Sequence, residues 1–240
     1  DLTGFSLSLD DLDKSVYDGG EEDHFVFISH YKVEAGTEAT LIRDLLEQII
    51  HDDPSHLANN LMAPVFIDSE NLVDLAKLQE HVKNSNAMIL LLTPGVLQRP
   101  WCLLEIVVAV SNNVTVVPVE IQRPGFRYTY PDESFYNRLL AGKIINEDAL
   151  DLLQSEDISL KDLEGALRQV FLKIAMPFSP HKSKQVRNAE IQDIMKRCRG
   201  EHRDRRTTLL DANFAMRNTT SVPRKTNRAS LVSLHGTSSC

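Results

Sequence analysis

The chain has 240 residues, of which 42% are hydrophobic, enough to build one sizeable domain with extensions. Its longest apolar run, Ala87–Leu92, is far shorter than the roughly 18–20 residues that cross a membrane, and no signal-peptide pattern is visible. The three cysteines form neither a disulfide framework nor a zinc-binding pattern. We therefore expect a cytoplasmic chain without a transmembrane segment or a metal site.

The charge is unevenly distributed along the chain, although the net value is −8. Residues 181–240 carry 13 Lys and Arg against 5 Asp and Glu, whereas the residues before them carry 13 against 29. A domain that reads nucleic acid is normally basic itself, so the acidic body argues against nucleic-acid partners. We predict an acidic, flexible leader over residues 1–23, a folded domain over 24–178, and a basic, largely disordered tail over 179–240 with one short helix near 189–197.

The apolar pattern predicts strands that alternate with helices. Apolar runs typical of buried strands occur at His24–Ser29, Pro64–Ile67, Ala87–Leu92, Val114–Val119 and Lys143–Ile145. Apolar residues at helical spacing predict helices over residues 41–50, 75–82, 101–110 and 160–174. Such an order indicates a flavodoxin-like, three-layer α/β fold of about five parallel strands with helices on both faces.

In this kind of fold, ligands and partners bind at the loops beyond the carboxyl ends of the strands. The sequence excludes several common sites there: it has no Gly-x-Gly-x-x-Gly after the first strand, no phosphate loop and no His-Glu-x-x-His. A two-component receiver needs an acceptor Asp at the end of the third strand, where this chain has Thr93 and Pro94. The segment that remains as a candidate site is Arg99–Glu105.

Trp101 and Glu105 are four residues apart, so a helix that begins at Pro100 places them on one face. A carboxylate there could hold ribose hydroxyls and stabilise positive charge at an anomeric carbon, and the indole could stack on a substrate. The structural alternative makes Trp101 a core anchor and Glu105 an early-turn acid favoured by the helix dipole. Spacing alone favours this alternative.

Four segments in order resemble motifs of the Toll/interleukin-1 receptor (TIR) domain family. They are the opening strand His24–His30, the second strand and following loop Val65–Leu72, the third strand region Asn84–Leu97, and Pro100–Glu105, which is similar to the family's Trp-Cys-x-x-Glu segment. The resemblance covers about two-thirds of the chain. It implies an innate-immunity signalling module that associates with other TIR domains or with itself, often through the loop after the second strand.

A subset of TIR domains also cleaves NAD⁺ into nicotinamide and an ADP-ribose product once assembled. The resemblance then makes Glu105 the catalytic carboxylate, with NAD⁺ as a substrate and no cofactor. It also implies two sets of further residues. The substrate-binding set is Trp101, His30, Lys32 and Phe66, and the interaction-loop set is Asp68, Ser69, Glu70, Asn71 and Asp74.

Some readings stay open. The function is either signalling by TIR association or NAD⁺ hydrolysis switched on by assembly, and a third possibility is an unrelated flavodoxin-like binding domain. His30 lines the site or is a hydrogen-bonded structural residue, and Cys102 is reactive or packed. The aromatic residues after the fourth strand form a partner surface or fold onto the core; they are Phe126, Tyr128, Tyr130, Phe135 and Tyr136.

Overall fold

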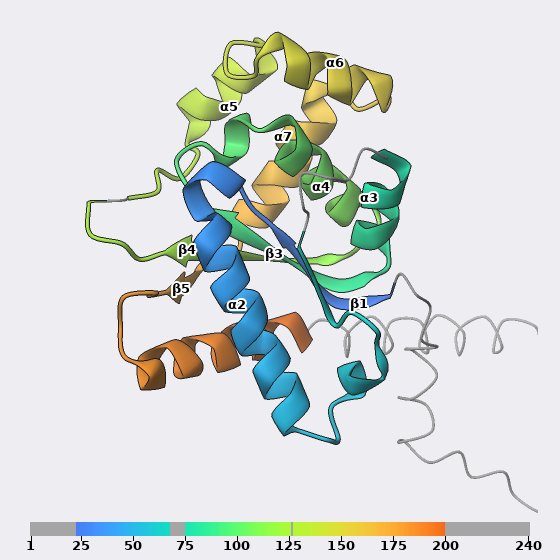
Figure 1. Ribbon diagram of the computed structural model, residues 1–240. Helices are drawn as coiled ribbons and strands as arrows, with labels where there is room; N and C mark the ends of the chain where they lie inside the picture. Colours follow the sequence, from blue (N-terminus) through green and yellow to red (C-terminus); the bar gives the residue numbers. More distant parts are fainter. Residues whose placement is uncertain (1–22, 68–74, 126, 200–240) are drawn as a thin grey trace, which may run out of the picture. The chain divides into compact units, whose positions relative to one another are not determined.

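The computed structural model describes residues 23–67, 75–125 and 127–199, which contain one parallel five-stranded sheet (Figure 1). The strands are β1 (His24–Ser29), β2 (Val65–Ile67), β3 (Ser85–Leu92), β4 (Thr115–Ile121) and β5 (Met176–Phe178). They are arranged in the order β2-β1-β3-β4-β5, and every neighbouring pair is parallel. This arrangement confirms the predicted flavodoxin-like α/β class.

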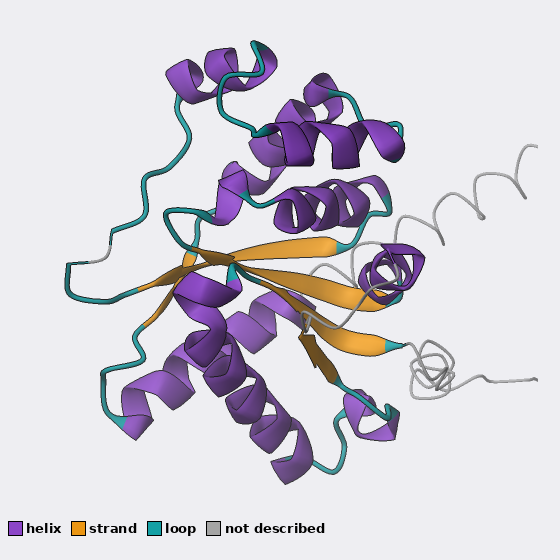
Figure 2. Ribbon diagram, turned by 45° about the horizontal axis from the view of Figure 1, so that its top comes forward, coloured by secondary structure: helices purple, strands orange, loops and turns teal. Residues whose placement is uncertain are grey.

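The sheet is apolar on both faces because helices cover both. In β3, the alternate residues Ile89 and Leu91 pack into one core, and Leu90 and Leu92 into the other. Figure 2 shows the two helical layers on either side of the sheet. This double cover explains why the strands read as uninterrupted apolar runs in the sequence.

One layer consists of α2 (Lys32–Asp52) and a helix over residues 184–199. The other layer is built from α3 (Leu75–Lys83), α4 (Pro100–Ser111), α5 (Glu133–Leu140), α6 (Glu147–Ser155) and α7 (Leu160–Phe171). Two short 3₁₀ turns, η1 (Leu57–Asn60) and η2 (Val96–Gln98), lie in the connections. None of the helices in the described ranges combines the length and the apolar composition that a membrane span needs.

The predicted fifth strand is wrong. Residues 143–145 form a bend between α5 and α6, and Ile145 packs into the helical core. The fifth strand is β5, which pairs with the end of β4. The helix before it ends at Phe171, and Ile174, predicted on its apolar face, is 83% exposed. The sequence alone suggests that Pro177 only ends this helix, but it lies within β5, where a proline is tolerated because β5 is an edge strand.

The packing of the helix over residues 184–199 extends the domain beyond the predicted end at residue 178. Ile191, Ile194, Met195 and Cys198 recur at helical spacing and are all buried against the α2 face of the sheet. A basic surface with one apolar stripe made this segment look like a tail in the sequence. The predicted leader, up to residue 22, and the tail beyond residue 199 lie outside the described residues.

Candidate functional site

The candidate site lies at the carboxyl ends of β1 and β3, which are neighbours in the sheet. The chain leaves β1 into α2 on one face and leaves β3 into α4 on the opposite face. In the view of Figure 1, α2 crosses in front of the sheet and α4 lies behind it near the top. Such a switch point opens a crevice in which flavodoxin-like folds bind ligands.

Glu105 lies in the second turn of α4 and is only 2% exposed. The hydroxyl of Ser29, the last residue of β1, donates a hydrogen bond of 2.5 Å to Glu105 Oε2. Residues 102–109 of α4 are all buried, and Glu105 is the only charged one among them. A buried carboxylate is costly unless hydrogen-bonded, so the Ser29 bond both satisfies Glu105 and ties α4 to the central strand.

The start of α4 is fixed by Pro100 at its first position and by a contact with the loop after β1. Cys102 is 4% exposed, and its thiol donates a hydrogen bond of 3.4 Å to the carbonyl oxygen of His30. Of the two readings left open, the structure favours a packed Cys102. The Ser29 and Cys102 bonds together hold the first two turns of α4 against the end of β1.

Trp101 and Glu105 lie in different environments, although one turn separates them. Trp101 is 41% exposed at the rim, whereas Glu105 is inside. Trp101 is therefore not a core anchor, and Glu105 is not a solvated acid at the helix start. The indole is thus partly accessible to an incoming molecule.

His30 and Lys32 follow β1 directly. His30 is largely buried, and this burial lowers the pKa of its imidazole, against a raising hydrogen bond to the Ile28 backbone and with a further lowering by the Lys32 charge. Nδ1 of His30 is buried and has no hydrogen-bond partner among the described residues. Lys32 is exposed in the first turn of α2. The structure thus places the His30 imidazole and the Lys32 side chain beside the same strand end.

Phe66 lies in a different environment from Glu105. Its ring stacks on His81 of α3 at 4.1 Å between centroids, and it also lies 4.8 Å from His24 and 5.5 Å from Phe27. We call these four residues the His24 cluster. Here Phe66 serves the packing of α3 onto the sheet.

The remaining predicted positions divide into two groups. The interaction-loop residues lie outside the described residues, so that assignment stays a prediction; they are Asp68, Ser69, Glu70, Asn71 and Asp74. Of the aromatic residues after β4, Tyr128 and Tyr136 are buried, and Tyr128 stacks on Phe171 of α7. These rings fold onto the core, and Phe126 lies outside the described residues.

Sequence reasoning missed Arg99 and Tyr31 as partners at this edge. The Arg99 guanidinium carbon lies 4.5 Å from the centre of the Tyr31 ring. Tyr31 precedes α2 and Arg99 precedes α4, so the pair bridges the two helix starts. The basic residue next to Pro100 was the available signal, but 68 positions of sequence separation hid its partner.

Two acidic residues of α2 hold the other loops of this edge in place. The carboxylate of Glu34 accepts the Gly95 N–H at 2.9 Å. A Cβ at Gly95 would lie 3.0 Å from that carboxylate and 3.1 Å from the Tyr31 ring, so a larger residue here would have to displace these side chains. Arg123, after β4, donates to the Glu34 carbonyl oxygen and pairs with Glu38 at 3.3 Å.

Fold and site together define a flavodoxin-like α/β domain with a buried, hydrogen-bonded carboxylate beside its switch point. Among solved structures, the chain is similar to the TIR domains in a structure of the activated Roq1 resistosome directly recognizing the pathogen effector XopQ. The sequence identity is 16% and the TM-score 0.39, over 71% of this chain and 96% of that chain. No protein-family model and no curated protein matches the chain.

Proposed function

We propose that the chain is a cytoplasmic signal-transduction module that acts by association of TIR-like domains, with itself or with others. The observation that supports this proposal is the placement of the four TIR-like segments. They fall in order on β1, β2, β3 and the start of α4, all of which belong to one parallel sheet and its cover. A chance likeness would have no reason to place all four segments on matching elements of one fold.

Self-association is tested by sedimentation velocity over a concentration series of the purified chain. We expect the weight-average sedimentation coefficient to rise with concentration. Glu70→Lys, in the predicted interaction loop, should weaken this rise because it reverses a charge in the contact. Asp151→Lys, at an exposed position on α6, is the matched control. A chain that stays monomeric alone and with other TIR domains would contradict the proposal.

The buried carboxylate favours a second activity, NAD⁺ hydrolysis. In this reaction the bond between the nicotinamide nitrogen and ribose C1′ breaks, and its electron pair stays on nicotinamide. Positive charge then develops at C1′, where the Glu105 carboxylate stabilises it, and water attacks C1′ with loss of a proton. The Ser29 hydroxyl donates to Oε2 and so fixes the position of the Glu105 carboxylate.

The burial of Glu105 gives assembly a role in this second activity. At 2% exposure, the carboxylate meets a substrate only when the loops at the strand ends separate. Association that moves these loops would open the crevice, so hydrolysis would depend on protein concentration. The first proposal does not require this step, which makes the two activities separable by experiment.

Nicotinamide release from NAD⁺, followed by chromatography, tests the second activity. We expect release at concentrations at which the protein associates, and a decrease of about a hundredfold or more in Glu105→Gln, because one transition-state charge contact is lost. The Asp151→Asn variant should retain full activity. The absence of release from associated wild-type protein would exclude the activity, and release that survives in Glu105→Gln would exclude Glu105 as the catalytic residue.

A further inference from the structure

A groove of about 400 Å³ lies where α6 ends and α7 begins, in the helical layer that also contains α4. It is separate from the candidate site, because none of its lining residues belongs to a loop that follows β1, β2 or β3. We call the seven lining residues the α6–α7 groove; they are Leu150, Leu153, Gln154, Asp157, Ile158, Ser159 and Leu160.

The groove has an apolar floor that the domain itself covers only in part. Leu153 is 1% exposed and belongs to the core. Leu150, Ile158 and Leu160 pack against that core but remain half-buried. An entering apolar side chain would remove more of their surface from water, which favours an apolar element in any molecule that binds here.

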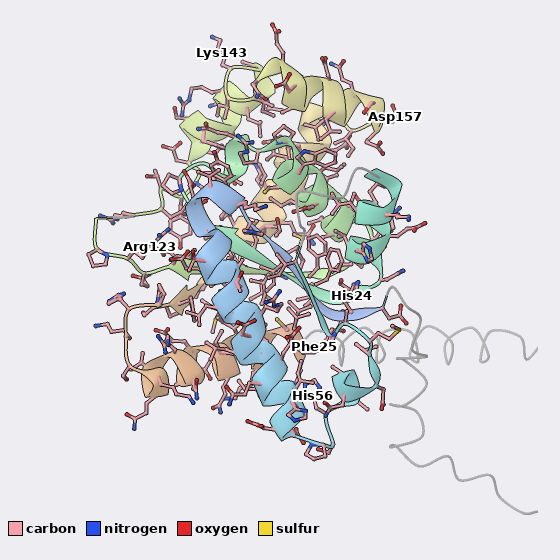
Figure 3. The ribbon with its side chains drawn as sticks, in the orientation of Figure 1. His24, Phe25, His56, Arg123, Lys143 and Asp157 are labelled. Carbon is pink, nitrogen blue, oxygen red and sulfur yellow. The ribbon has the colours of Figure 1, made fainter. Side chains whose placement is uncertain are left out.

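The groove also lies beside a strongly acidic stretch. Residues 147–157 contain five acidic and no basic residues. Glu147 and Asp148 lie in the first turn of α6, where the positive end of the helix dipole favours them. Figure 3 shows Lys143 and Asp157 at opposite ends of the α5–α6 region, so this basic side chain is not next to Asp157. The carboxylate that local structure explains least is therefore Asp157.

Asp157 occupies a position that would suit glycine better. Its φ of +57° lies in the left-handed region, and the other such residues in the described ranges are uncharged: Asn113, Gly125 and Gly142. The turn is closed by backbone bonds alone, from Asp157 N–H to the Gln154 carbonyl at 3.1 Å and from Ile158 N–H to the Leu153 carbonyl at 2.8 Å. An acid here also faces the negative end of the α6 dipole.

The Asp157 carboxylate is not used by the described part of the fold. No ion pair or side-chain hydrogen bond joins it to another described residue, and the residue is exposed. A negative charge that the turn does not need, at the edge of an apolar hollow, favours a ligand that is both cationic and apolar.

We propose that the α6–α7 groove binds a basic, amphipathic helix of a partner protein. Apolar side chains of that helix, spaced three and four residues apart, would cover Leu150, Ile158 and Leu160. Arginine or lysine residues beside them would pair with Asp157. Charge complementarity selects this occupant, because the acidic stretch beside the groove would repel an acidic segment. The proposal requires neither NAD⁺ cleavage nor self-association.

Three labelled peptides of about 14 residues, long enough to form a helix on binding, test the groove by fluorescence anisotropy with the full chain. The first has leucines at i, i+3, i+4 and i+7 and arginines and alanines elsewhere. The second has glutamate for arginine, and the third has serine for leucine. We expect only the first to bind. No binding of the first peptide, or equal binding of either of the others, would overturn the proposal.

A substitution inside the groove locates the binding. Gln154 lines the groove and is exposed on α6, so Gln154→Arg adds a positive charge without disturbing the core. We expect it to weaken binding of the leucine–arginine peptide about tenfold or more, because like charges then meet. Gln169→Arg adds the same charge at an exposed position near the other end of α7 and should leave the affinity unchanged. Equal losses in both variants would overturn the assignment to the groove.

Substitutions of Asp157 separate binding from a structural role. Asp157→Asn keeps the shape of a side chain that tolerates the left-handed region and should weaken peptide binding about threefold or more, because one charge pair is lost. Asp157→Gly should weaken it similarly while the thermal midpoint stays the same or rises, because the backbone cost is relieved. Unchanged peptide affinity in both variants would overturn the proposal.

A second copy of the chain is the competing occupant, and sedimentation velocity distinguishes it. If Asp157→Asn reduced self-association and left peptide binding unchanged, the groove would be a contact between copies, and the proposal of a basic partner would be overturned. Peptide binding uses neither NAD⁺ nor the sedimentation readout, so its failure would leave the proposed function untouched.

Discussion

The two ends of strand β1 differ in whether their buried polar atoms are hydrogen-bonded. At the amino end, His24 Nδ1 donates to the Ala63 carbonyl oxygen at 2.7 Å, and its Nε2 lies 2.9 Å from His81 Nδ1. At the carboxyl end, His30 Nδ1 and the Thr93 hydroxyl have no partner among the described residues. Figure 3 shows His24 near the right of the sheet, at the amino ends of the strands, and Arg123 near its left, just beyond the carboxyl end of β4.

This contrast suggests that the two ends of one six-residue strand have different roles, packing at one end and binding at the other. The His24 cluster closes its hydrogen bonds and stacks its rings, so it contributes stability and leaves nothing for a ligand. The switch-point end keeps an exposed indole, a stacked guanidinium and unpaired polar atoms. Regions that bind are expected to be less optimised for stability than regions that only pack.

The largest expected difference comes from aromatic truncation at the two ends. Phe66→Ala should lower the free energy of unfolding by about 2–4 kcal/mol, because the stacked contacts of a partly buried ring are lost. Trp101→Ala should lower it by less than about 1 kcal/mol, because the indole is partly exposed. Urea unfolding measures both. Similar decreases in the free energy of unfolding of the two variants would contradict the proposal that only the Phe66 end of the strand is specialised for packing.

Acid should destabilise the protein through a histidine near the packed end. His56 contacts Phe25 edge-to-face at 5.1 Å, and burial, helped by the charge of Arg199, lowers its pKa to about 4. Because the folded pKa lies below the unfolded value of 6.5, the unfolded chain binds more protons between these values. Stability from the neutral His56 should therefore be complete above pH 6.5 and decrease as the pH falls toward 4, by up to about 3 kcal/mol.

Unfolding followed across this pH range in wild type and His56→Gln checks the effect. The slope should become smaller in His56→Gln and stay the same in His51→Gln, which changes an exposed histidine of α2. His30, whose pKa is also lowered, adds a contribution of the same sign in all three proteins. A wild-type slope in His56→Gln would assign the acid sensitivity to other groups.

A smaller loss is expected when the bond between β1 and α4 is cut. Ser29→Ala leaves the buried Glu105 carboxylate without its hydroxyl donor and should lower the free energy of unfolding by about 1–3 kcal/mol. In a double-mutant cycle with Glu105→Gln, the two losses should be coupled, because the residues share one bond. Additive losses would show that Ser29 and Glu105 act independently.

The core strands could be predicted from the sequence because a doubly covered strand needs apolar residues at every position. Residues 25–28 of β1 and 87–92 of β3 are all apolar, whereas β5 has three residues, one of them Pro177, and gives no such signal. The final helix was underestimated because its buried stripe of Ile191, Ile194 and Cys198 is masked by many basic residues. A local sequence pattern therefore identifies elements that contain a clear apolar run or stripe. It misses elements whose position depends on their packing against other parts of the chain.

The candidate site was predictable only in part for a related reason. Glu105 stood out through its segment, but its hydrogen bond to Ser29 joins residues 76 positions apart. The Arg99–Tyr31 contact and the unpaired Thr93 hydroxyl also arise only once β1 and β3 are adjacent. Phe66 was assigned to the site through the family resemblance, yet its ring stacks on His81 of α3.

The two edge strands of the sheet restrict how copies of this domain can join. β2 and β5 each have three residues, and β5 contains a proline that lacks an N–H donor. A foreign strand would find few backbone groups with which to form a ladder, so fibre-like growth by strand addition is disfavoured. Within the described residues, we therefore expect copies to associate through loops and helix surfaces, which can separate again without disturbing the sheet.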